Sequence, residues 1–188
     1  MEPASLVMEQ KMLRGIKRRA EKLASRRNTA GGDRAMTTET TDFLTRERAA
    51  IVDATAAALA QTHERHYEAA GAAEVRRRLD VLYDRLLESL AERDVGPIVA
   101  YAQQIAAERF AGGYDLAEVQ TAFNALEAAV WTAVFTTLEP TAFARTLGLV
   151  STVLGAAKDA LAREYVSLVT NAHAPSLDLR ALFAGISV

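Results

Sequence analysis

Residues 73–97 read AEVRRRLDVLYDRLLESLAERDVGP, and this stretch decides the fold class. Its large apolar residues recur three and four positions apart, which places them on one face of an α-helix. Gly96-Pro97 ends the pattern, and Pro97 suits the first turn of a following helix because an N–H group there would be unpaired anyway. The stretch therefore predicts a helix over about residues 73–93 and the start of another. The apolar positions are Val75, Leu79, Leu82, Leu86, Leu87 and Leu90.

The rest of the chain has the same character. Thr41 or Asp42 is suited to cap a helix that continues to about residue 70, where Gly71 stops it. No alternating run of β-branched residues bounded by turn residues occurs, and alanine and leucine dominate. We therefore expect an all-α fold, a single helical domain of about five helices over residues 36–173. The remaining predicted helices cover about residues 97–111, ended by Gly112-Gly113, about 116–138, capped by Asp115, and about 141–173.

Composition narrows the class of protein. The chain has 188 residues, half of them hydrophobic, which is enough for one sizeable core. It has no cysteine, which excludes disulfides and thiolate catalysis and fits a reducing compartment. No run reaches the roughly 18 uncharged residues that a membrane span requires, and no secretory signal pattern follows the first basic residues. We expect a cytoplasmic protein without a transmembrane segment.

The net charge of −2 hides a basic N-terminal arm on an acidic body. Residues 1–35 carry nine Lys or Arg against four acids, and the segment from Asn28 to Asp33 has the composition of a linker. Such an arm suits nucleic acid, an anionic membrane surface or an acidic protein, and a solvated extension is the plain alternative. Met36 is an alternative translation start. The basic side chains that concern us are Lys11, Arg14, Lys17, Arg18, Arg19, Lys22, Arg26 and Arg27.

The C-terminal tail, residues 174–188, is unusually apolar. Five large hydrophobic residues follow Pro175, and such residues need a groove to receive them. Two interpretations stay open: the tail is a docking peptide for a protein partner, or it covers the core of its own chain. The five residues are Leu177, Leu179, Leu182, Phe183 and Ile186.

Histidine and acidic side chains raise the question of a metal or catalytic site. His63 and His66 are three positions apart, so both rings could face one metal ion. A di-iron bundle would need Glu-x-x-His pairs on two helices, and haem would need a histidine in an apolar pocket, whereas this stretch is polar. We expect solvated histidines, no cofactor and no enzymatic activity, because the common catalytic and nucleotide-binding motifs are missing as well.

Trp131 lies among apolar residues in the predicted helix 116–138. We expect it to belong to the core. The alternative is a small-ligand pocket lined by Phe123, Trp131 and Phe135.

The stretch from Tyr101 to Trp131 resembles the RsbRD-type N-terminal domain, a family related to the N-terminal sensor of the RsbR stressosome co-antagonists. The likeness extends over about residues 43–172. It implies a globin-like helical sensor without haem, dimeric, placed ahead of an output domain such as a phosphorylatable STAS domain. The phosphorylation sites of the family lie in the STAS part, so none is carried over to this chain. The matching residues are Ile105, Arg109, Gly113, Leu116, Glu118, Val119, Ala122, Leu126 and Trp131.

These observations predict a globin-like or bundle-like regulatory module that is not an enzyme. We expect it to form a homodimer and to signal by protein contact through its tail, in a stress response as the resemblance implies. The alternatives are a small-ligand sensor with an apolar pocket and an adaptor that binds nucleic acid or anionic membrane through the N-terminal arm.

Overall fold

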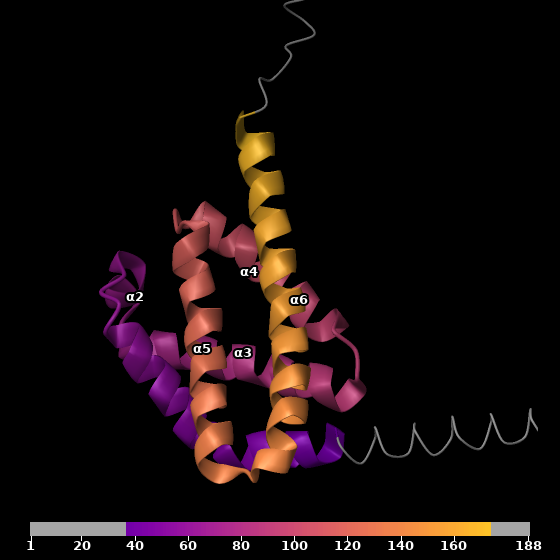
Figure 1. Cartoon of the computed structure of the whole chain (residues 1–188). Coiled ribbons are helices and arrows are strands. Elements are labelled where there is room, and N and C mark those ends of the chain that lie inside the picture. Colours follow the sequence, from indigo (N-terminus) through magenta and orange to yellow (C-terminus); the bar gives the residue numbers. More distant parts are fainter. Residues whose placement is uncertain (1–36, 174–188) are drawn as a thin grey trace, which may run out of the picture.

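The computed structural model describes residues 37–173, which form six helices and no strand (Figure 1). This confirms the all-α prediction. The predicted basic arm and apolar tail lie outside the described residues. The helices are the first helix (residues 37–60), α2 (Arg65–Ala70), α3 (Ala72–Glu92), α4 (Gly96–Ala111), α5 (Leu116–Thr137) and α6 (Pro140–His173).

The helices enclose one hydrophobic core. The first helix runs along one end of the molecule, α3 crosses behind α5 and α6, and α5 and α6 run antiparallel in front of α4 (Figure 1). Among α2 to α6, the most extensive packing joins α4 to α6, followed by α5 to α6. The end of α6 extends past the neighbouring helices (Figure 1).

The apolar face predicted for α3 is the face that enters the core. Five of its six predicted positions are buried, and Leu87 is half-buried. Tyr83 is buried as well, and its hydroxyl donates a hydrogen bond of 2.8 Å to the backbone oxygen of Leu44 in the first helix. That bond satisfies the one polar atom that the tyrosine brings into the core.

Side-chain caps explain where two helices begin. Asp115 caps α5, because its Oδ1 accepts a hydrogen bond of 2.7 Å from the N–H of Glu118. Buried Ser89 accepts one of 3.1 Å from the N–H of Ile98 in the first turn of α4, where Pro97 stands as predicted. The Gly112-Gly113 stop is also confirmed, and Gly113 adopts a φ of 77°, which favours glycine.

The single helix predicted over about residues 42–70 is wrong at its start and in its interior, whereas its end at Ala70 before Gly71 is confirmed. Residues 61–64 form a turn that separates the first helix from α2, and His63 adopts a φ of 53° in that turn. Thr41 does not cap a helix either. It lies inside the first helix, where its hydroxyl donates to the backbone oxygen of Thr37 at 3.1 Å. A helix break without glycine or proline leaves no local signal in the sequence.

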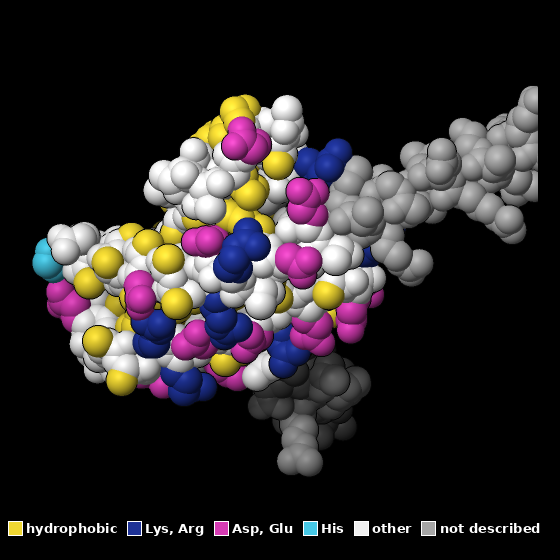
Figure 2. Space-filling view, turned by 90° about the horizontal axis from the view of Figure 1, so that it is seen from below, with side chains coloured by type: hydrophobic (Ala, Val, Ile, Leu, Met, Phe, Trp, Pro, Cys, Tyr) yellow, Lys and Arg dark blue, Asp and Glu magenta, His cyan; other side chains and the backbone are white. Residues whose placement is uncertain are grey.

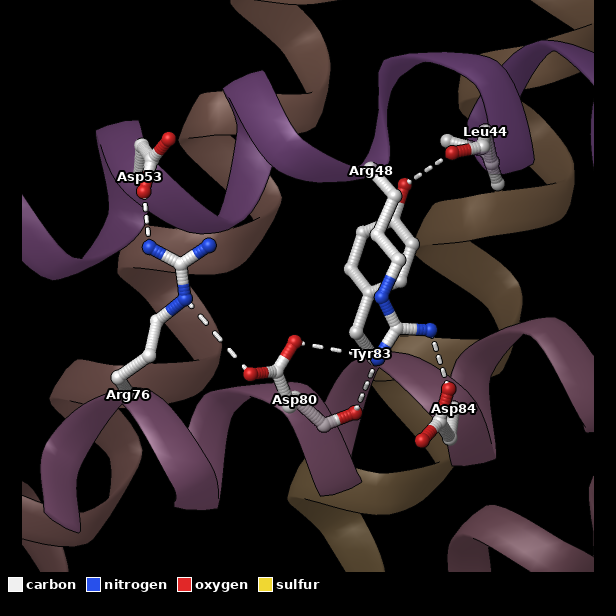
Figure 3. A network of polar contacts seen from close by, with 7 residues as sticks. All are labelled: Leu44, Arg48, Asp53, Arg76, Asp80, Tyr83 and Asp84. Atoms are coloured by element: carbon white, nitrogen blue, oxygen red, sulfur yellow. Dashed lines mark hydrogen bonds and ion pairs between the residues drawn. The ribbon is translucent and has the colours of Figure 1, made fainter. Parts of the chain in front are cut away.

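Ion pairs join the first helix to α3 at the surface (Figure 3). Arg48 contacts Asp80 at 3.1 Å and also Asp84, while Arg76 contacts Asp53 and reaches Asp80 at 3.6 Å. On the face seen from below, positive and negative side chains are interspersed (Figure 2). The two helices are therefore held by matched charges outside and by apolar packing inside.

Within residues 37–173, no helix is long and apolar enough to cross a membrane.

Candidate functional site

Buried polar side chains gather where α2 meets the start of α5. Glu118 is only 5% exposed, and its carboxylate accepts a hydrogen bond of 3.0 Å from the backbone N–H of His66. Its second oxygen lies 2.7 Å from Nδ1 of the same histidine. Tyr67 donates to the backbone oxygen of Glu118 at 3.1 Å. α2 contains no fully buried residue, so these polar contacts and the packing of Tyr67 and Ala70 against the core hold it in place.

The two histidines differ in their exposure to solvent. His63 is exposed and pairs with Glu68 at 3.1 Å, which agrees with the expectation of a solvated side chain. His66 is not a solvated side chain, because it is half-buried and hydrogen-bonded to Glu118. Its partner is 52 positions away in the sequence, so the local pattern could not reveal the contact.

Tyr114 connects this cluster to three further helices. Its ring stacks on His66 with 4.1 Å between ring centres. Its hydroxyl accepts a hydrogen bond of 3.0 Å from Arg78 of α3, and its backbone oxygen accepts one of 3.4 Å from Tyr165 of α6. The guanidinium carbon of Arg109 lies 5.2 Å from the centre of the same ring, in cation–π geometry.

A small cavity opens beside this cluster, between the first five helices. Its volume is about 40 Å³, and we name it the Arg–Tyr cavity. Its polar walls come from α2, α3 and α4, and its apolar walls come mainly from α3, α4 and α5. Burial raises the pKa of Tyr67 and of Tyr101 above the ordinary tyrosine value, so both phenols are neutral near pH 7. The walls include Tyr67, Arg78, Tyr101, Ile105, Arg109 and Phe123.

The aromatic residues proposed for an apolar ligand pocket do not surround one cavity. Phe123 is buried in the core, but Trp131 is 42% exposed and Phe135 is 53% exposed. The prediction that Trp131 belongs to the core is therefore wrong. Residues 128–135 are apolar almost all round the helix, so the sequence does not fix which face turns inward.

The exposed aromatic residues instead form a surface patch. Trp131 contacts Phe135 edge to face at 6.3 Å between ring centres, and Phe135 contacts Phe143 of α6 at 5.1 Å. We name these three residues the aromatic patch. No charged residue occurs from Ala128 to Leu138 or from Thr146 to Ala157, although 24% of the whole chain is charged.

A shallow groove of about 400 Å³ runs beside the patch, between the first helix and α5. Ala128 and Thr132 line it, and each precedes an exposed aromatic residue by one helical turn. Its walls are almost entirely alanine and threonine, with Glu47 as the single charged residue among them.

The remaining predicted sites have little to add. Among residues 37–173, no three His, Asp or Glu side chains come together as a metal site would require. The glutamates Glu64, Glu68, Glu88 and Glu92, which form two pairs four positions apart, are at least partly exposed. Glu88 contacts Arg85. The candidate docking residues of the tail and the basic residues of the arm lie outside the described part of the chain and stay predictions.

No family model, curated protein or solved structure matches this chain. The resemblance of residues 101–131 to the RsbRD-type domain therefore stays a prediction.

Proposed function

We propose that this chain is a non-enzymatic regulatory module that acts by protein–protein contact, with a second copy of itself as the occupant of the aromatic patch. The observation that carries the proposal is the exposure of Trp131 and Phe135 on successive turns of α5. Tryptophan and other aromatic residues supply much of the binding energy of protein interfaces, whereas a monomer would leave them in water. The resemblance to a family of dimeric sensor domains supports the same class of function.

The surroundings of the patch favour a second copy over an unrelated partner. Interface centres are depleted in charged residues, and the stretches of α5 and α6 that flank the patch contain none. The surface also offers protruding aromatic side chains beside a neutral groove. A surface with both features is complementary to itself, as a twofold symmetric contact requires.

The test is the molar mass of the full-length chain in solution, measured by light scattering and sedimentation over a wide concentration range. The wild type should sediment as a dimer, and the double variant Trp131→Ser, Phe135→Ser should be a monomer. Because both side chains are already exposed in one copy, the monomeric variant should remain folded with an unchanged circular dichroism spectrum.

Val166→Ser, Val169→Ser is the matched control. These valines are also exposed, 63% and 42%, but they lie near the other end of α6. The control should stay dimeric. A wild type that is monomeric at every concentration would overturn the proposed contact, and so would a dimer that survives loss of both aromatic side chains.

A further inference from the structure

Arg109 is a half-buried arginine whose guanidinium makes no hydrogen bond and no ion pair with any residue in the described range 37–173. Two other arginines that line cavities beside α3 and α4 each have a carboxylate within reach: Arg78 binds Glu74, and Arg85 binds Glu88. The nitrogen atoms of Arg109 keep contact with water, because no buried side-chain nitrogen or oxygen among the described residues lacks a hydrogen-bond partner. A guanidinium that faces a cavity and has no carboxylate beside it is free to pair with a bound anion.

Tyr101 adds a second unused donor. Its ring is half-buried in the wall of the Arg–Tyr cavity, yet its hydroxyl forms no hydrogen bond within the described part of the chain. Arg109 and Tyr101 both belong to α4 and stand eight positions apart, two turns of one helix. The rigid helix therefore presents two donors to one cavity before any ligand arrives.

The lining of the cavity selects an anion. It contains two guanidinium groups, those of Arg78 and Arg109, and no carboxylate. The acids nearby have partners of their own: Glu74 binds Arg77 and Arg78, Glu118 binds His66, and the exposed Glu108 accepts a hydrogen bond from Gln104. An acceptor-only group with a negative charge would satisfy the donors of Arg109 and Tyr101 together.

The size and the remaining walls select a carboxylate. A volume of about 40 Å³ holds roughly three water molecules, since each needs about 10–15 Å³. That space suits the three heavy atoms of a carboxylate group, and an attached alkyl chain needs further room. The other walls are aliphatic or aromatic, among them Leu79, Ile105 and Phe123, and they cannot complete the many hydrogen bonds that a phosphate dianion requires.

A second cavity of about 200 Å³ adjoins the first. The two share the side chains of Leu59, Tyr67 and Val75 as walls. The second cavity is lined mostly by alanine and other apolar residues, with Glu68 as the one charged side chain. A carboxylate held by Arg109 could therefore carry an alkyl chain toward this neighbouring apolar space.

We propose that the Arg–Tyr cavity binds a small monocarboxylate. The guanidinium of Arg109 pairs with both carboxylate oxygens, Tyr101 donates to one of them, and Arg78 adds a second positive charge from α3. The alkyl part of the ligand extends along Leu59 and Val75 toward the neighbouring cavity. This site is separate from the aromatic patch, so it does not depend on the proposed dimer contact.

Titration calorimetry of the full-length chain with butyrate tests the proposal. A ligand of about six heavy atoms is expected to bind with a dissociation constant on the order of 1 mM. Affinity should rise about fourfold per added methylene from acetate to butyrate, as apolar burial predicts. Neutral butyramide should not bind, and inorganic phosphate and chloride should bind more weakly than butyrate.

The variants assign the binding to the cavity. Arg109→Gln should weaken butyrate about 10- to 100-fold, and Tyr101→Phe by a smaller factor. Arg46→Gln removes the same charge from an exposed site on the first helix and should bind like the wild type. Melting without ligand separates a binding role from a structural one. Because Arg109 would lose only its cation–π contact with Tyr114, Arg109→Gln should melt within a few degrees of the wild type.

Three results would overturn the proposal. The first is no heat of binding with any monocarboxylate at tenfold the expected dissociation constant. The second is tighter binding of phosphate than of butyrate. The third is butyrate binding that persists unchanged in folded Arg109→Gln protein, which would place the ligand elsewhere.

Discussion

Arg48 and Arg109 are both half-buried, and each lies against a tyrosine ring, with 5.4 Å from guanidinium to ring centre for Arg48 and 5.2 Å for Arg109. The two arginines differ in whether a carboxylate lies beside the positive charge. Arg48 sits between Asp80 and Asp84, which offset the loss of water around it (Figure 3). Arg109 has no such acid in the described residues and faces the Arg–Tyr cavity.

The difference separates a region built for stability from one suited to binding. Where the first helix meets α3, apolar side chains fill the inside and the polar atoms are paired, as with Tyr83 and Leu44. Around Arg109, hydrogen-bond donors without a partner among the described residues face the Arg–Tyr cavity. Polar groups that make no hydrogen bond within the fold are typical of functional sites.

The largest expected effect is in the first region. Leu86 is fully buried, so Leu86→Ala should lower the free energy of unfolding by about 3 kcal/mol, through lost apolar burial and the space left behind. Urea titration followed by circular dichroism measures this. The neighbouring variant Leu87→Ala is the control, since Leu87 is only half-buried and should cost clearly less. Equal losses would mean that the described core is misplaced.

A smaller loss is expected where polar contacts hold α2. Glu118→Ala leaves the N–H of His66 without its acceptor and should cost about 2 kcal/mol. Because α2 buries no residue, its amides should also exchange with deuterium much faster than those of α3. Glu68→Ala, which removes an exposed carboxylate from α2 itself, should change neither quantity appreciably. Unchanged exchange in Glu118→Ala would show that α2 has another support.

The two arginines can be compared directly. Arg48→Gln should lower the free energy of unfolding by about 1 kcal/mol, because partly exposed ion pairs contribute little and salt screens them. Asp80 and Asp84 would also be left one helical turn apart without the cation between them. Arg109→Gln should lower it by less than Arg48→Gln, or raise it. The opposite order in chemical denaturation would remove the distinction between the two regions.

The smallest effect concerns a paired carboxylate between α5 and α6. Burial alone would raise the pKa of Glu127, but hydrogen bonds from Lys158 at 2.7 Å and Ser151 at 2.7 Å hold that pKa below its ordinary value. The contact therefore stabilises the fold above the unfolded-state pKa of glutamate and is lost as pH falls through the lower folded-state value. Between pH 7 and pH 3, Glu127→Gln should lose less stability than the wild type, by less than about 1 kcal/mol. Parallel stability curves for the two proteins would contradict this.

The sequence predicted the parts of the fold that depend on the spacing of apolar residues and on residues that end or cap helices. The apolar positions of α3, the stop at Gly112-Gly113 and the cap at Asp115 all appear as expected. The sequence did not predict the helix break at residues 61–64, because that stretch has no glycine or proline. It also did not predict which face of α5 turns inward, because that part of the helix is apolar on nearly every side.

The candidate site was harder to predict, because its residues come together only in three dimensions. Arg78, Arg109 and Tyr67 each look like an ordinary surface or half-buried residue in its own helix. No sequence pattern shows that their side chains meet, or that an aspartate is missing beside one arginine and present beside another. Arg109 was singled out only as part of the resemblance to a sensor family, and without a chemical role.

The length of α6 gives the molecule a lever. Its 34 residues span about 50 Å, and the helix begins immediately after the tight turn at Glu139. Tilting such a rod by about 5° about its first turn would carry its far end through about 4 Å. At Tyr165, about 38 Å along the helix, the same tilt would move the side chain by about 3 Å and break its hydrogen bond of 3.4 Å to Tyr114, so that bond and the packing of α6 on α4 hold the rod at its present angle.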